Sequence, residues 1–147
     1  MAALAVALAA LAGLGGAVQV AVMGRLGERV GVFPAVAFST MVSIAVAFAA
    51  LLLVRRSVAG VGDVLHQPRW LWIGGLLSVF IVFTMTFAAP RIGTAATIGT
   101  VIAGNLVMGA AIDGYGLFGL DRIPLNWARV LGLAFLAAGA GLSLHRG

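Results

Sequence analysis

The chain has 147 residues, of which 63% are apolar and 9% charged, and its mean hydropathy is +1.17. A soluble domain of this length has too little core to hide so much apolar surface, whereas a lipid bilayer accommodates it. The net charge of +5 comes from nine arginines that form no basic run, which argues against nucleic-acid binding, and the absence of cysteine excludes disulfides and thiolate metal sites.

Five apolar segments of membrane-spanning length follow one another along the chain. Each is close to the ~20 residues that a helix needs to cross a hydrocarbon core of ~30 Å. We expect an all-α integral membrane protein with one transmembrane domain over residues 1–147. Its helices are predicted at about residues 2–23, 35–54, 70–89, 92–112 and 128–144.

Prolines mark two of the predicted helix boundaries. Residues 24–33 are expected to form a loop, with Pro34 in the first turn of the second helix, and Pro90 with Arg91 is expected to separate the third helix from the fourth. Glu28 in the first loop is close in sequence to Arg25 and Arg29, which predicts a local ion pair in the headgroup zone.

The first two helices carry few polar side chains. Gln19 is the one polar side chain of residues 2–23. Because an amide is costly in lipid, we expect it to face either a solute path or another helix, and both alternatives stay open. The hydroxyls of Ser39, Thr40 and Ser43 are expected to bond to backbone carbonyls one turn earlier in their own helix.

The fourth helix has one polar, glycine-lined face. At 100° per residue Thr97 and Thr100 share a stripe, and Asn105 lies along its edge. This face is expected to meet a solute path or another helix. Asp113 is predicted to end the helix, where a carboxylate opposes the helix dipole. The last helix, predicted to be capped by Asn126, has pairs of small residues four apart and is expected to serve in packing or dimerisation.

Several local motifs resemble the YdcZ-like family of the drug/metabolite transporter superfamily, which is distantly related to small multidrug resistance proteins. The resemblance spans essentially the whole chain and keeps the order of its segments. Its residues are Gly16-Ala17-Val18-Gln19, Pro34, Trp72-Ile73-Gly74-Gly75-Leu76-Leu77, Pro90-Arg91-Ile92-Gly93-Thr94-Ala95, Gly104-Asn105 and Asp113-Gly114-Tyr115-Gly116-Leu117-Phe118-Gly119.

This resemblance implies a five-helix transporter unit in the bacterial inner membrane, an exporter of a small molecule that works as a pair of units. The partner is implied to be an identical chain of opposite orientation, a paired homologue or a fused second half. The charges allow either orientation, because five arginines fall on the N-terminal side of the predicted spans and four on the other. These are Arg55, Arg56, Arg69, Arg122 and Arg129 against Arg25, Arg29, Arg91 and Arg146.

The residues predicted to act fall into two groups. Hydrogen bonds to the solute are expected from Gln19, Thr97, Thr100 and Asn105, and charge at a gate or vestibule from Arg25, Arg91 and Asp113. Because no acidic residue lies inside the predicted spans, a proton-coupled cation antiporter is disfavoured, and a neutral or anionic solute is expected.

Two other functions compete with transport. A non-transporting assembly partner for another membrane protein would also use many small-residue stripes. A membrane-embedded enzyme is disfavoured because the predicted spans hold no His/Asp/Glu cluster and no activated nucleophile. For the same reason we expect no cofactor and no metal site, so the predicted partners are the lipid bilayer, an unknown solute and a second transporter unit.

Overall fold

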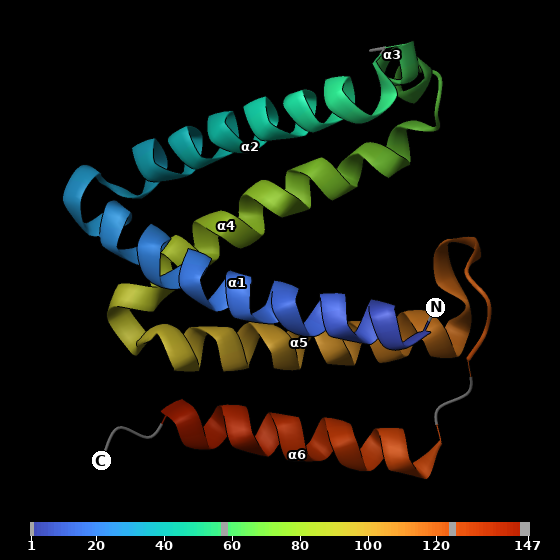
Figure 1. Ribbon diagram of the computed structural model, residues 1–147. Coiled ribbons are helices and arrows are strands. Elements are labelled where there is room, and N and C mark those ends of the chain that lie inside the picture. Colours follow the sequence, from blue (N-terminus) through green and yellow to red (C-terminus); the bar gives the residue numbers. More distant parts are fainter. Residues whose placement is uncertain (1, 57–58, 124–125, 145–147) are drawn as a thin grey trace. The chain divides into compact units, whose positions relative to one another are not determined.

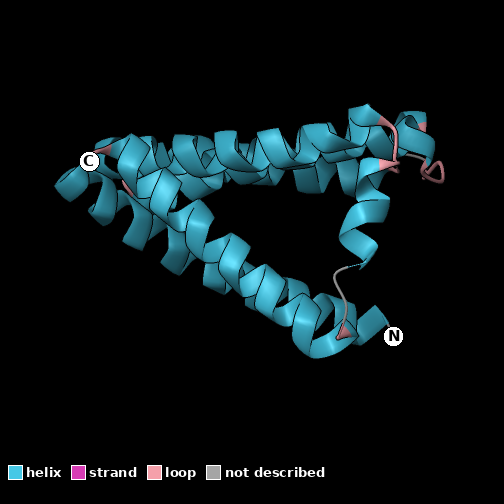
Figure 2. Ribbon diagram, turned by 90° about the horizontal axis from the view of Figure 1, so that it is seen from above, coloured by secondary structure: helices cyan, strands magenta, loops and turns pink. Residues whose placement is uncertain are grey.

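The computed structural model describes residues 2–56, 59–123 and 126–144. These residues are helical almost throughout and contain no strand (Figure 2). Four helices are long and apolar enough to cross a membrane within the described ranges, and α6 is a shorter apolar helix of 18 residues, ~27 Å at the standard rise. The prediction of an all-α membrane protein with about five spans is confirmed. The four long helices are α1 (Ala2–Val30), α2 (Val32–Arg55), α4 (Ile73–Ile92) and α5 (Thr94–Tyr115), followed by α6 (Trp127–Leu144). The short elements are α3 (Ala59–Leu65), η1 (Arg69–Trp72) and η2 (Leu117–Gly119).

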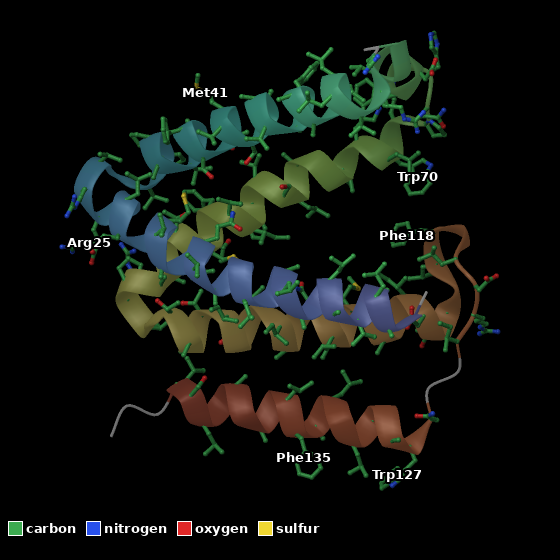
Figure 3. All side chains as sticks on the ribbon, in the orientation of Figure 1. Arg25, Met41, Trp70, Phe118, Trp127 and Phe135 are labelled. Atoms are coloured by element: carbon green, nitrogen blue, oxygen red, sulfur yellow. The ribbon has the colours of Figure 1, made fainter. Side chains whose placement is uncertain are left out.

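Large apolar side chains project outward from these helices. Met41 on α2, and Trp127 and Phe135 on α6, are exposed and point away from the neighbouring helix (Figure 3). In water such exposure would drive aggregation, but in a bilayer these side chains meet lipid tails of the same polarity.

At two places in the chain, a single glycine joins one long helix to the next. We call these two positions corners. Gly31 lies between α1 and α2 with φ 91° and ψ 154°, and Gly93 lies between α4 and α5 with φ 89° and ψ 152°. This backbone region is accessible essentially to glycine alone. Each glycine follows an arginine and a β-branched residue, in Arg29-Val30-Gly31 and Arg91-Ile92-Gly93.

Both corners keep the backbone hydrogen-bonded while the chain changes direction. The N–H of Gly31 donates to the Gly27 carbonyl at 3.0 Å, and the Gly31 carbonyl accepts from the N–H of Ala35 at 3.2 Å. The N–H of Gly93 donates to Ala89, and its carbonyl accepts from Thr97, both at 3.0 Å. One helix therefore ends and the next begins across a single residue whose own N–H and C=O are both hydrogen-bonded.

The corners differ from the predicted boundaries. The loop expected at residues 24–33 is wrong, because α1 continues to Val30 and α2 begins at Val32. Pro34 does lie in the first turn of α2, as predicted. Pro90 does not break its helix but lies within the last turn of α4, and the break comes at Gly93. The predicted ion pair is confirmed between Arg25 Nη1 and Glu28 Oε2, at 3.0 Å.

The chain folds as two compact units, of which one is Val22–Phe87. Within it α2 and α4 lie side by side, and α3 belongs to the connection at their far ends (Figure 1). Its small core is built on Met23, Ala35 and Val36, against which Val82 and Phe83 pack. The rings of Phe33 and Phe83 extend this cluster, with centroids 5.2 Å apart.

Hydroxyl groups in this unit bond back to their own helix, as the sequence predicts. Thr40 Oγ1 donates to the Val36 carbonyl and Ser43 Oγ to the Ser39 carbonyl, both at 2.9 Å. Thr86 is 1% exposed and donates to Val82 at 2.7 Å. These side chains therefore add no unpaired polar atom to the lipid-facing surface.

The corner glycines are expected to be intolerant of a side chain. Alanine at position 31 or 93 would have to adopt the glycine-only region, at a cost of about 1–3 kcal/mol. Gly104→Ala is the matched control, because a Cβ there has no atom within 4 Å and lies inside a helix. Unfolding by sodium dodecyl sulfate in mixed micelles should show Gly31→Ala and Gly93→Ala destabilised relative to this control. Equal midpoints would contradict the corner geometry.

Gly27 lies so close to Thr86 that a side chain at position 27 should clash with it, and a smaller residue at position 86 should relieve the clash. A Cβ at this position would lie 2.7 Å from Thr86 Cγ2. Gly27→Ala should therefore cost about 1–3 kcal/mol of unfolding free energy, as overpacking does. Adding Thr86→Ser removes the methyl group, keeps the hydroxyl and should restore most of the loss. If the unfolding free energy lost by the double variant equalled the sum of the losses of the two single variants in the same micelle titration, the two residues would not be in contact.

Candidate functional site

The second unit comprises Met1–Ala21 and Ala88–Gly147, and its helices α5 and α6 lie side by side (Figure 1). Near the start of α5 they approach closely, since a Cβ on Gly99 would lie 3.4 Å from Ser143 Oγ and 3.5 Å from Ala140 Cα. Ala140 is buried here. The small residues of α6 thus serve helix packing at this end, in keeping with the expected packing role.

Towards the other end of α5 the two helices enclose a pocket of about 300 Å³. We call it the α5–α6 pocket. One wall comes from α5 and the other from α6, and the lining residues are Asn105, Leu106, Gly109, Ala110, Asp113, Gly132, Leu133 and Leu136. Asn105, Gly109 and Asp113 recur every four residues, so they lie one above another on the same face of α5.

Two glycines leave the room for this pocket. A Cβ built on Gly109 or on Gly132 would meet no atom within 4 Å. No side chain therefore projects into the pocket from these two positions. Leu133 and Leu136 of α6 supply apolar surface beside them. The pocket can enclose the apolar part of a solute and present an amide and a carboxylate to its polar groups.

The end of α5 next to the pocket is closed by a folded-back loop. Gly116 adopts a left-handed conformation, and its N–H donates to the Ile112 carbonyl. Arg122 Nε donates to the Gly114 carbonyl at 2.9 Å, and the N–H of Ile123 donates to the Asp113 carbonyl at 3.0 Å. The loop thus pairs the carbonyls that a helix end leaves open, and it places a guanidinium where the helix dipole favours positive charge.

Asp113 lies within the last turn of α5 and does not end the helix as predicted, because α5 continues to Tyr115. The candidate membrane span Thr94–Tyr115 therefore contains an acidic residue. This corrects the premise that the spans hold none. Asp113 is half-buried and shares the α5–α6 pocket with Asn105, so the structure brings together one residue from each predicted group.

The other predicted site residues lie elsewhere. Thr97 is 2% exposed, and its hydroxyl donates to the Gly93 carbonyl at 2.8 Å, so it reinforces the corner. Thr100 donates to the Ala96 carbonyl at 2.8 Å, and Gln19 is exposed on α1; none of these three lines the pocket. Arg25 pairs with Glu28, and Arg91 lies in the last turn of α4.

A second pocket lies between α2 and α4, with a volume of about 580 Å³. Its walls include Phe33, Phe80 and Phe83, and Thr40 is its one polar lining residue, with a hydroxyl that already donates to Val36. It offers apolar contact but little that could orient a polar solute. Across the described residues, no group of three or more His, Cys, Asp or Glu side chains could hold a metal ion.

Because the chain has no native cysteine, single cysteines can report which face of α5 meets water. Asn105→Cys lines the pocket, whereas Val107→Cys projects from an exposed position outside it. A membrane-impermeant methanethiosulfonate reacts with the thiolate, which does not form in lipid. Asn105→Cys should react at least about tenfold faster in intact membranes. Equal rates would show that the pocket is not open to water.

The chain is similar to known inner-membrane proteins over most of its length. A sequence model of the family described as "Putative inner membrane exporter, YdcZ" matches residues 4–142. The chain is 31% identical over 140 residues to the inner membrane protein YdcZ of Escherichia coli (strain K12), covering 92% of this chain and 91% of that protein. No solved structure gives a significant match. The chain therefore belongs to the YdcZ family of inner-membrane exporters and, with its several apolar helices, is a multi-pass membrane transporter rather than an enzyme.

Proposed function

We propose that this chain exports a small solute through the α5–α6 pocket, as a single transmembrane domain of the drug/metabolite transporter superfamily. The observation that carries the proposal is the shared pocket of Asn105 and Asp113. Polar side chains in membrane spans are costly, and those that face a cavity are commonly part of a solute path.

The positions of the two residues fit a path into the membrane. Asn105 lies near the middle of the 22-residue α5, whereas Asp113 lies in its last turn. A solute that meets Asp113 at the membrane surface could then move past Gly109, where no side chain obstructs it, to the amide of Asn105. Gln19, Thr97 and Thr100 remain candidate ligands in this proposal, Arg25 and Arg91 remain candidate vestibule charges, and Asn105 and Asp113 have the strongest support.

We further propose that two units of opposite orientation form the working transporter. The arginines are almost evenly divided between the two sides of the predicted spans, which permits insertion both ways. Gln19 supports a partner, because its exposed amide within α1 would otherwise face lipid. Two inverted copies would provide the two-fold arrangement that many secondary transporters use. The partner is a second copy or a homologue.

Filling the pocket tests the proposed path. Gly109→Leu should block the α5–α6 pocket, while Gly104→Leu is a control on an exposed position of the same helix outside it. Cells producing each variant would be compared with wild type by mass spectrometry of metabolites in the medium. Gly109→Leu should reduce the wild-type-dependent solutes to the level of cells lacking the protein, and Gly104→Leu should not.

Two results would contradict this proposal. Unchanged export by Gly109→Leu would remove the pocket from the path. If the metabolites in the medium were the same with and without the wild-type protein, and the protein formed a stable complex with another membrane protein, the assembly-partner function would be favoured.

Reporters fused to the C-terminus test the inverted pair. Alkaline phosphatase is active only outside the inner membrane and green fluorescent protein only inside it. Activity of both fusions is expected for a chain that inserts in both orientations. Activity of one fusion alone would exclude an antiparallel homodimer and direct the search to a homologue of opposite orientation.

A further inference from the structure

We infer that the α5–α6 pocket takes an organic cation with an apolar body, its charged group at Asp113 and its body against Leu133 and Leu136. This inference rests on the proposed export function. The evidence is the composition of the wall: among its described residues, Asp113 is the one charged side chain, Asn105 is the one neutral polar side chain, and the rest are apolar or glycine.

Two groups contribute negative potential at this end of the pocket. Asp113 lies in the last turn of α5, where the helix dipole contributes negative potential in addition to the carboxylate. An anion would therefore meet two unfavourable contributions. Arg122 offsets part of the dipole, but its Nε is directed to the Gly114 carbonyl, and Arg122 does not line the pocket.

The carboxylate keeps capacity for a bound solute. Its two oxygens can accept about four hydrogen bonds, so a contact within the chain does not exhaust them. A charge-assisted hydrogen bond from an ammonium group is also stronger than one between neutral groups. Asp113 therefore discriminates by charge, and Asn105, about two helical turns away or ~12 Å along the axis, can bind a polar group at the other end of the solute.

This inference replaces the expectation of a neutral or anionic solute. That expectation depended on an Asp113 outside the membrane span, and the structure places it inside α5. The apolar part of the solute follows from the leucines, whose side chains offer dispersion contact and no hydrogen bond.

Three probes with one carbon skeleton test the charge preference. Phenylbutylammonium, phenylbutanol and phenylbutyrate would be titrated calorimetrically into the purified full chain in a neutral detergent. The ammonium ion is expected to bind at least about tenfold more tightly than the alcohol, and the carboxylate to bind least. Tighter or equal binding of the alcohol or the carboxylate would overturn the inference, as would binding of none of the three.

Variants assign the preference to one side chain. Asp113→Asn keeps the shape of the side chain and should lower the affinity for the ammonium ion about tenfold while leaving that for the alcohol unchanged. Asp121→Asn, at an exposed loop position outside the pocket, is the matched control and should bind like wild type. An unchanged ammonium affinity in Asp113→Asn would overturn the inference.

The pocket-filling variant separates this inference from the proposed function. Loss of all probe binding in Gly109→Leu, together with insensitivity to Asp113→Asn, would leave the pocket as the site and reject only the cation. Full ammonium binding in Gly109→Leu would reject the pocket itself. The inference is supported when Gly109→Leu abolishes ammonium binding and Asp113→Asn weakens it selectively.

Discussion

The fold depends on the cost of leaving a peptide group unpaired in lipid. No water is present in the hydrocarbon core to bond a free N–H or C=O, so the chain is helical from end to end of each span. The same cost acts where the chain turns. Gly31 and Gly93 join long helices through one residue each, and both remain hydrogen-bonded on either side. Only a residue without a Cβ adopts this geometry readily, which explains glycine at both positions.

The same constraint divides the polar side chains into those that bond within their own helix and those that line a pocket. Hydroxyls such as those of Thr86 and Thr97 bond to carbonyls of their own helix, so they need no solute or partner. Asn105 and Asp113 instead line a pocket between two helices. The glycines at positions 109 and 132 keep this pocket open, while the contact of Gly99 with Ala140 holds the helices together farther along. One end of the α5–α6 pair is therefore closely packed, and the other end encloses the pocket.

Much of the fold could be predicted from hydropathy, because each span is apolar over the thickness of a bilayer. The helix ends were harder to predict. The prolines predict boundaries at Pro34 and Pro90. The chain also carries the usual stop signal of a basic residue in the last turn followed by glycine, in Arg29-Val30-Gly31 and Arg91-Ile92-Gly93. That signal is present at both corners, but the same pattern in Arg25-Leu26-Gly27 lies inside α1 and ends no helix.

Only part of the candidate site can be predicted from the sequence. The helical period predicts a polar face of α5 through Thr97 and Thr100 with Asn105 at its edge, but of these three only Asn105 lines the pocket with α6, and Thr97 bonds to the corner. Which face of α5 meets α6 depends on contacts between distant segments. Asp113 differs from its predicted place because α5 continues to Tyr115, beyond the predicted helix end at residue 112.

Photochemical capture inside cells tests most directly whether the α5–α6 pocket is the solute path. A photoreactive phenylalanine analogue would replace Leu136, which lines the pocket, or Phe135, which projects away from it (Figure 3). After irradiation, the intact mass of the purified protein reveals what was attached. We predict an adduct of a small, non-lipid solute at position 136 and lipid adducts alone at position 135. Lipid adducts alone at both positions would contradict the account.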